Sequence, residues 1–145
     1  MVFVRDEGSL FDAPLEEVWA YLGSGEPHSA AHHHANVDRI REGPGAVSYG
    51  WEMPFEGRHS RFRMRSYAFV PLGVVFDVVE GPFEGSRFLL LYSPRGTRTR
   101  VSIVGEFRSP VLAESEIAPA VNRFFEREFA EDSAGLREWM ARRAR

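Results

Sequence analysis

The segment from Asn36 to Pro110 constrains the fold most, because turn signals interrupt it at short intervals and no helical pattern lies between them. Turns rich in glycine and proline are expected at 43–45, 54–57, 71–73, 81–85 and 94–96. Connections this short join antiparallel neighbours, since parallel strands need long crossovers. The segment therefore predicts a meander of about six strands. They are Val37–Arg41, Ala46–Met53, His59–Val70, Val74–Glu80, Ser86–Ser93 and Thr97–Arg108.

Side chains alternate along these strands, so each strand has one polar and one apolar face. The apolar face gathers aromatic and large aliphatic residues, among them Val47, Tyr49, Trp51, Met53, Phe62 and Met64. On the polar face we expect Arg61, Arg63 and Arg65 to be solvated and paired across strands with Glu52, Glu80 or Glu106. A site for phosphate or an acidic surface is the alternative. We expect Asp77 to pair with an arginine at the surface, rather than to act inside as a general acid or base.

Helical patterns flank the meander. Val2 to Phe11 predicts a first strand, and a helix follows with Asp12 as its N-cap and Gly23 at its end. The stretch 24–35 is a polar, histidine-rich connection with room for a short second helix. Residues 113–145 predict a long amphipathic helix with Pro119 near its beginning and a bend or interruption at 132–135.

This order of elements is typical of the α+β class, in the sequence β-α-α-β6-α. A twisted antiparallel sheet curls, so we expect about seven strands to wrap around the long C-terminal helix in one domain covering 1–145.

Residues 10–22, LFDAPLEEVWAYL, resemble the opening of the START / polyketide-cyclase / birch-pollen-allergen superfamily. The resemblance implies the helix-grip fold, with a hydrophobic cavity between the sheet and the long helix that holds lipids, sterols or polyketides. The superfamily has no common catalytic set, so the resemblance implies a fold and a cavity but no reaction.

Composition excludes several kinds of chemistry. The chain has no cysteine and no lysine, which rules out thiolate metal sites, cysteine nucleophiles and Schiff-base lysines. Its net charge of −3 argues against a nucleic-acid partner. No apolar run approaches the roughly 20 residues of a membrane span, and charges at 5–7 argue against a signal peptide. We therefore expect a cytoplasmic protein without stable membrane insertion.

The expected ligand-binding residues are the inward aromatic and aliphatic side chains together with two histidines. They are Trp19, His32, His34, Tyr49, Trp51, Phe62, Met64, Phe88, Tyr92, Val121, Phe124 and Phe125. Tyr49 and Tyr92 would orient a polar group of the ligand. The alternative is that these side chains fill the core completely.

Four histidines gather at His28, His32, His33 and His34. On a helix the first two would share a face at a spacing that can bind a transition metal, but two ligands make an incomplete site. Asp38, Glu26 or His59 would have to complete it. We expect a polar loop, and hence no metal and no cofactor, with pocket-lining donors and a metal site as alternatives.

The leading hypothesis is binding or transport of a hydrophobic small molecule in the cavity. A polyketide cyclase or aromatase acting in the same cavity is the first alternative, although no catalytic residue can be assigned. A protein-interaction or chaperone-activator module, marked by an exposed apolar patch, is the second. A homodimer is compatible with all three.

Overall fold

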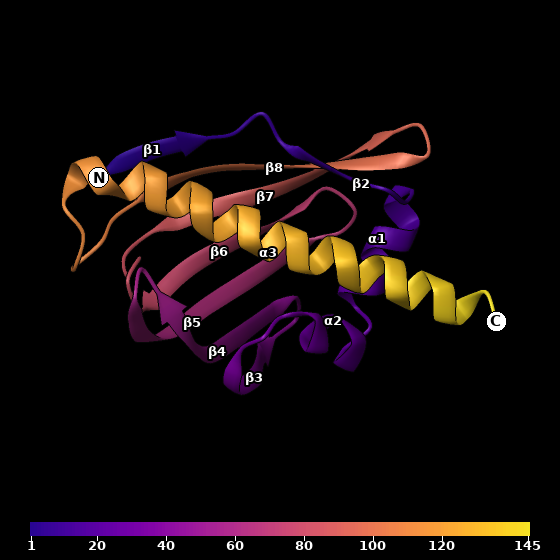
Figure 1. Cartoon of the computed structure of the whole chain (residues 1–145), viewed down its shortest axis with the longest axis horizontal. Coiled ribbons are helices and arrows are strands. Elements are labelled where there is room, and N and C mark those ends of the chain that lie inside the picture. Colours follow the sequence, from indigo (N-terminus) through magenta and orange to yellow (C-terminus); the bar gives the residue numbers. More distant parts are fainter.

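The computed structural model describes residues 1–145 and contains eight strands and three helices (Figure 1). In chain order the elements are β1 (Val2–Arg5), β2 (Ser9–Phe11), α1 (Leu15–Leu22), α2 (Glu26–Ala31), β3 (Ala35–Gly43), β4 (Ala46–Phe55), β5 (Arg58–Phe69), β6 (Gly73–Glu80), β7 (Arg87–Arg95), β8 (Arg98–Phe107) and α3 (Glu114–Arg143).

All strands belong to one antiparallel sheet with the order β1-β8-β7-β6-β5-β4-β3, and β2 also pairs with β8. Strands β3 to β8 follow one another as hydrogen-bonded neighbours, so the predicted meander is confirmed. The 30-residue helix α3 crosses one face of this sheet, and α1 and α2 lie toward its C-terminal half (Figure 1). The prediction of a sheet wrapped around a long terminal helix is thereby confirmed.

The first strand departs from its predicted form, because it breaks into β1 and β2 around Asp6 and Gly8. The Asp6 carboxylate accepts a hydrogen bond from the Ile103 N–H at 2.8 Å, while its own N–H donates to the Ile103 carbonyl at 3.1 Å. Gly8 has φ +88°, and a Cβ there would lie 2.9 Å from the Val101 carbonyl oxygen. The chain therefore kinks and resumes its pairing with β8, which adds a strand to the expected seven.

Helix boundaries also differ in two places. Helix α1 takes Pro14 as its N-cap instead of Asp12, which lies 3.5 Å from Arg98 in an exposed ion pair. Helix α3 runs through 132–135 without the expected bend. A side-chain carbon at Gly135 would collide with the Tyr21 hydroxyl and the Ala31 methyl group. The glycine at this position thus lets α1 and α2 pack against α3 and does not interrupt it.

Two clusters of buried side chains form the core. The larger lies between the sheet and the N-terminal half of α3 and is rich in phenylalanine, including Phe55, Phe62, Phe83, Phe88, Phe107 and Phe124. The smaller joins β2, α1, β7, β8 and the C-terminal half of α3, and comprises Phe11, Ala13, Val18, Tyr21, Tyr92, Val101 and Leu136.

The polar face of the sheet is covered by ion pairs. Arg61 lies 3.4 Å from Glu80, as expected, whereas Arg63 and Arg65 reach across β4 and pair with residues of β3 rather than with Glu52 or Glu106. Their partners are Asp38 at 2.7 Å and Glu42 at 2.6 Å. Asp77 pairs with Arg87 at 2.6 Å, which confirms its predicted arginine partner. None of the three helices has the length and hydropathy that crossing a bilayer requires.

Candidate functional site

A cavity of about 1490 Å³ lies between the sheet and α3 and borders both core clusters. Ligand pockets commonly measure about 300–1,000 Å³, so this space is ample for a small organic molecule. Most of the surface area of its wall is apolar, and the apolar side chains come mainly from β4 to β8 and α3. The apolar part includes Trp51, Met64, Phe76, Phe88, Leu90, Val101, Ile103, Phe125 and Phe129.

Ten of the twelve residues expected to bind a ligand line this cavity. They are Trp19, His32, His34, Tyr49, Trp51, Met64, Phe88, Tyr92, Phe124 and Phe125. Phe62 and Val121 do not, since both are fully buried in the larger core cluster. The Phe62 ring stacks on Trp51 at 5.2 Å and on Phe124 at 5.7 Å between centroids. Phe62 thus supports two lining side chains from behind.

Several polar groups face the cavity. Burial and the charge of Asp132 raise the pKa of Tyr92, so its hydroxyl stays protonated. This hydroxyl makes no hydrogen bond within the protein. The Trp19 indole N–H is already used, because it donates to the Pro71 carbonyl at 2.8 Å. On β3, Arg39 and Arg41 line the cavity without an ion pair, and the Arg39 guanidinium lies 5.8 Å from the Tyr49 ring centre.

The histidine segment places three imidazoles on the cavity wall. His28 belongs to α2, and His32 ends this helix in an extended conformation. Side chains alternate along extended backbone, so His32 and His34 lie on one side while the His33 side chain is exposed. His28, His32 and His34 all line the cavity, which agrees with the pocket-lining alternative for this segment.

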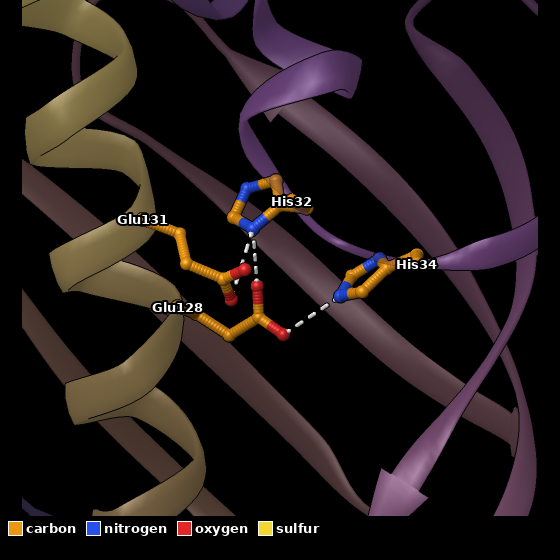
Figure 2. A group of neighbouring side chains, drawn as sticks. All are labelled: His32, His34, Glu128 and Glu131. Atoms are coloured by element: carbon orange, nitrogen blue, oxygen red, sulfur yellow. Dashed lines mark hydrogen bonds and ion pairs between the residues drawn. The ribbon is translucent and has the colours of Figure 1, made fainter.

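Facing these histidines, α3 presents three carboxylates at spacings of three and four residues, Glu128, Glu131 and Asp132. Glu128 lies between two imidazoles, with Oε2 2.6 Å from His32 Nδ1 and Oε1 3.1 Å from His34 Nε2 (Figure 2). Glu131 Oε1 is 3.7 Å from His32 Nδ1, and its other oxygen accepts the His33 backbone N–H at 3.1 Å. We call His32, His34, Glu128 and Glu131 the four-residue cluster.

Asp132 extends this arrangement on the other side of the His32 ring. Its Oδ1 lies 2.9 Å from His32 Nε2 and 3.1 Å from His28 Nε2. The Tyr21 hydroxyl also donates to it at 3.4 Å. The Asp132 carboxylate is therefore surrounded by donors.

These contacts shift the protonation equilibria strongly. Burial lowers the pKa of His32, but close contacts with the carboxylates of Asp132 and Glu128 outweigh it and raise that pKa to about 11. Burial raises the pKa of Asp132, while hydrogen bonds from His28 and His32 outweigh it and lower the pKa to about 2. The same competition, with His32 and His34 as partners, lowers the pKa of Glu128. The bare protein therefore holds an imidazolium between two carboxylates.

A row of rings in mutual contact, edge-on between His28 and His32 and stacked from His32 to Trp51, connects the histidines with the core. The centroids are 5.4 Å apart from His28 to His32, 5.1 Å from His32 to His34 and 5.0 Å from His34 to Trp51. The His34 and Trp51 planes differ by 7°. This packing fixes the orientation of the imidazoles, as a binding or catalytic site requires.

The sequence pattern did not identify the carboxylate partners. Asp38, one of the three expected to complete the histidines, is bound to Arg63, and His59 lies near Glu52. The partners from α3 lie nearly 100 residues away in the chain. The helical spacing of these carboxylates is visible in the sequence, but only the fold places the carboxylates beside the histidines. The arrangement can transfer a proton along the His32 ring or hold a divalent cation with nitrogen and oxygen ligands.

Comparison with known proteins assigns a family and a fold. The profile of the family described as polyketide cyclase / dehydrase and lipid transport matches residues 7–140. Among curated proteins none matches the chain.

Three solved structures with low sequence identity share the fold. An aromatase/cyclase (Zhui) from Streptomyces sp. R1128 has a TM-score of 0.72 and 14% identity, covering 99% of this chain and 96% of its own. Ara h 8.0201 has a TM-score of 0.73 and 9% identity, with coverages of 94% and 98%. A START superfamily protein from Mycobacterium smegmatis has a TM-score of 0.68 and 14% identity, with coverages of 95% and 98%.

Identities this low establish a common fold and leave the chemistry open. They confirm the predicted helix-grip architecture. The profile match shows that the chain belongs to the polyketide cyclase / dehydrase and lipid transport family.

Proposed function

We propose that this protein binds a hydrophobic small molecule in the cavity between the sheet and α3. The observation that carries the proposal is the cavity of about 1490 Å³ with its largely apolar and aromatic wall. Burial contributes roughly 25 cal/mol per Å² of apolar surface, so a ligand that buries about 300 Å² gains about 7.5 kcal/mol. The entropy lost on association reduces this gain, so burial of this area alone gives binding weaker than about 3 μM.

The polar groups on the wall favour a ligand with an apolar body and one polar or acidic end. Tyr92 offers a free hydroxyl donor deep in the cavity. Arg39 and Arg41 offer two guanidinium groups that no carboxylate of the protein neutralises. Arginine binds carboxylates through paired hydrogen bonds, so a fatty acid or a similar amphipathic acid fits this wall.

The test uses two adjacent leucines of β7 that point in opposite directions. Leu90 lines the cavity, whereas Leu91 is 41% exposed on the other face. We expect Leu90→Trp to weaken binding of the fluorescent fatty acid cis-parinaric acid at least tenfold, because the indole occupies the space. Leu91→Trp serves as the control and should change binding less than twofold. Absence of binding to the wild type, or equal binding by both variants, would refute the proposal.

A cyclase or aromatase activity is the second candidate, and the ionisable cluster on the wall of the same cavity favours it. In such a reaction a carboxylate takes a proton from the carbon between two carbonyl groups of a poly-β-ketone chain. The carbanion then attacks a distant carbonyl carbon, which closes the ring, and the imidazolium of His32 protonates the resulting alkoxide. Loss of water from this alcohol introduces a carbon–carbon double bond into the ring.

The two candidates differ in what a change at His32 does. For a cyclase, His32→Gln abolishes ring formation from a poly-β-ketone thioester and leaves binding within about threefold. For a binding protein, wild type and variant both return the substrate uncyclised. Ring formation is measured by chromatography with mass detection, and binding by quenching of intrinsic fluorescence. Equal turnover by wild type and His32→Gln would exclude this role for His32.

A further inference from the structure

We propose that the four-residue cluster of His32, His34, Glu128 and Glu131 is a binding site for a divalent transition metal ion of the Zn²⁺ class on the cavity wall. This reverses the expectation of no metal drawn from the histidine segment of the sequence. The proposal does not depend on the identity of the cavity ligand.

The candidate donor atoms already lie close to one another. One nitrogen or oxygen from each of the four residues lies within 4.8 Å of the others. Zinc bonds of about 2.0–2.2 Å in tetrahedral geometry place neighbouring donors about 3.4 Å apart. The separations from His32 Nδ1 to Glu128 and Glu131 are 2.6 and 3.7 Å, and His34 Nε2 is 3.1 Å from Glu128. Small side-chain movements would bring all four donors to bonding distance.

Two atoms of the cluster are buried without a hydrogen-bond partner. They are His32 Nδ1 and Glu131 Oε1, and the only other such side-chain atom in the protein is Trp51 Nε1. His32 Nδ1 is close to Glu128 but is not aligned for a hydrogen bond with it. Leaving a buried polar atom unpaired costs about 1–3 kcal/mol. A cation between the two unpaired atoms would satisfy both.

The surroundings of the cluster match those of known metal sites. A metal-bound imidazole usually donates its second N–H to a carboxylate, which fixes the ring and its tautomer. His32 has this arrangement, because Nε2 lies 2.9 Å from Asp132 while Nδ1 faces the cluster. The His33 N–H holds the other Glu131 oxygen at 3.1 Å, and Trp51 stacks on His34. Each of these contacts restricts one ligand.

The donor set indicates the class of metal. Two imidazoles and two carboxylates suit zinc and its transition-metal neighbours, whereas Ca²⁺ and Mg²⁺ prefer oxygen ligands alone. All four side chains are only 13–14% exposed, yet three of them, His32, His34 and Glu128, line the cavity. A polar group of a bound small molecule could therefore approach the ion directly.

The competing explanation is an ion-pair network in which a proton on His32 takes the place of the metal. Metal binding releases that proton, so the two states exclude each other at Nδ1. The proposal is decided by whether the untagged protein binds zinc stoichiometrically through these four residues.

The experiment uses the full chain freed of metal with a chelator, followed by calorimetric titration with ZnCl₂ and visible spectroscopy with CoCl₂. We expect one ion per chain and the absorption bands of tetrahedral cobalt. His34→Ala and Glu131→Ala should each weaken zinc binding roughly 10- to 100-fold or more. His33→Ala is the matched control and should bind like the wild type, because its side chain is exposed beside the cluster.

Circular dichroism and urea unfolding show that each variant is folded. A wild type that binds no zinc would overturn the proposal in favour of the ion-pair network. Zinc binding that survives in both His34→Ala and Glu131→Ala would overturn the assignment to these residues. The neighbouring group of His28, His32 and Asp132 would then hold the ion, and His28→Ala would weaken zinc binding.

Discussion

Replacing two phenylalanines by alanine distinguishes the packed core from the cavity wall. Phe62 is 0% exposed and touches three aromatic rings, so Phe62→Ala loses the transfer free energy and leaves a closed void. Such substitutions lower the free energy of unfolding by about 3–5 kcal/mol. Phe76 stacks on Phe88 at 4.9 Å but borders the cavity, which already lacks packing partners. Phe76→Ala enlarges an existing space, and a loss of about 1–2 kcal/mol is expected.

Thermal and urea unfolding followed by circular dichroism measure this difference. At roughly 2–4 °C per kcal/mol for a chain of this size, Phe62→Ala should lower the melting temperature by about 6–20 °C and Phe76→Ala by about 2–8 °C. Equal losses at the two positions would refute the reasoning. They would mean that the space beside Phe76 is filled in solution, and the ligand-binding proposal would lose its foundation.

Three further substitutions test individual contacts. Thr99→Val removes the buried hydrogen bond of 2.8 Å to the backbone carbonyl before Pro14, and urea titration should show a loss of about 1–3 kcal/mol. Gly8→Ala should lower the melting temperature by several degrees more than Gly96→Ala, because both have positive φ but only Gly8 is crowded by β8. A hydrogen bond from Arg87 holds the pKa of Asp77 below its usual value, so the pair stabilises the protein above the unfolded pKa of about 3.9. Asp77→Asn should therefore cost under about 1 kcal/mol at pH 7, a difference that disappears as the pH falls through the native pKa.

Local patterns were sufficient to predict the layers of the fold. Turn residues at short intervals and period-two alternation determine a meander, and both can be read within a few residues. The break between β1 and β2 was not predictable in this way, because it depends on the contacts of Asp6 and Gly8 with β8. The uninterrupted α3 likewise depends on Gly135 meeting Tyr21 and Ala31, where a local rule suggested a bend.

The sequence predicted which face of each strand turns toward the cavity. It did not predict which residues of that face reach the cavity, or which carboxylates contact the histidines. Alternation assigned Phe62 and Met64 to the same side of β5, yet only Met64 reaches the cavity. Whether an inward side chain is packed or lines a space depends on the separation of sheet and helix, which varies along the molecule. The meeting of His32 with Glu128 joins residues almost 100 positions apart, and no local signal encodes it.

The two edges of the sheet have different consequences for association. The β1–β2 edge is short and broken, whereas β3 presents nine residues along an open edge. This strand has two register irregularities and carries the charges of Asp38, Arg39, Arg41 and Glu42. Bulges and charges are the means by which natural sheets prevent another chain from adding a strand. Val37, Arg39 and Arg41 of this strand also line the cavity, so the same bulges and charges disfavour the addition of a strand beside the cavity.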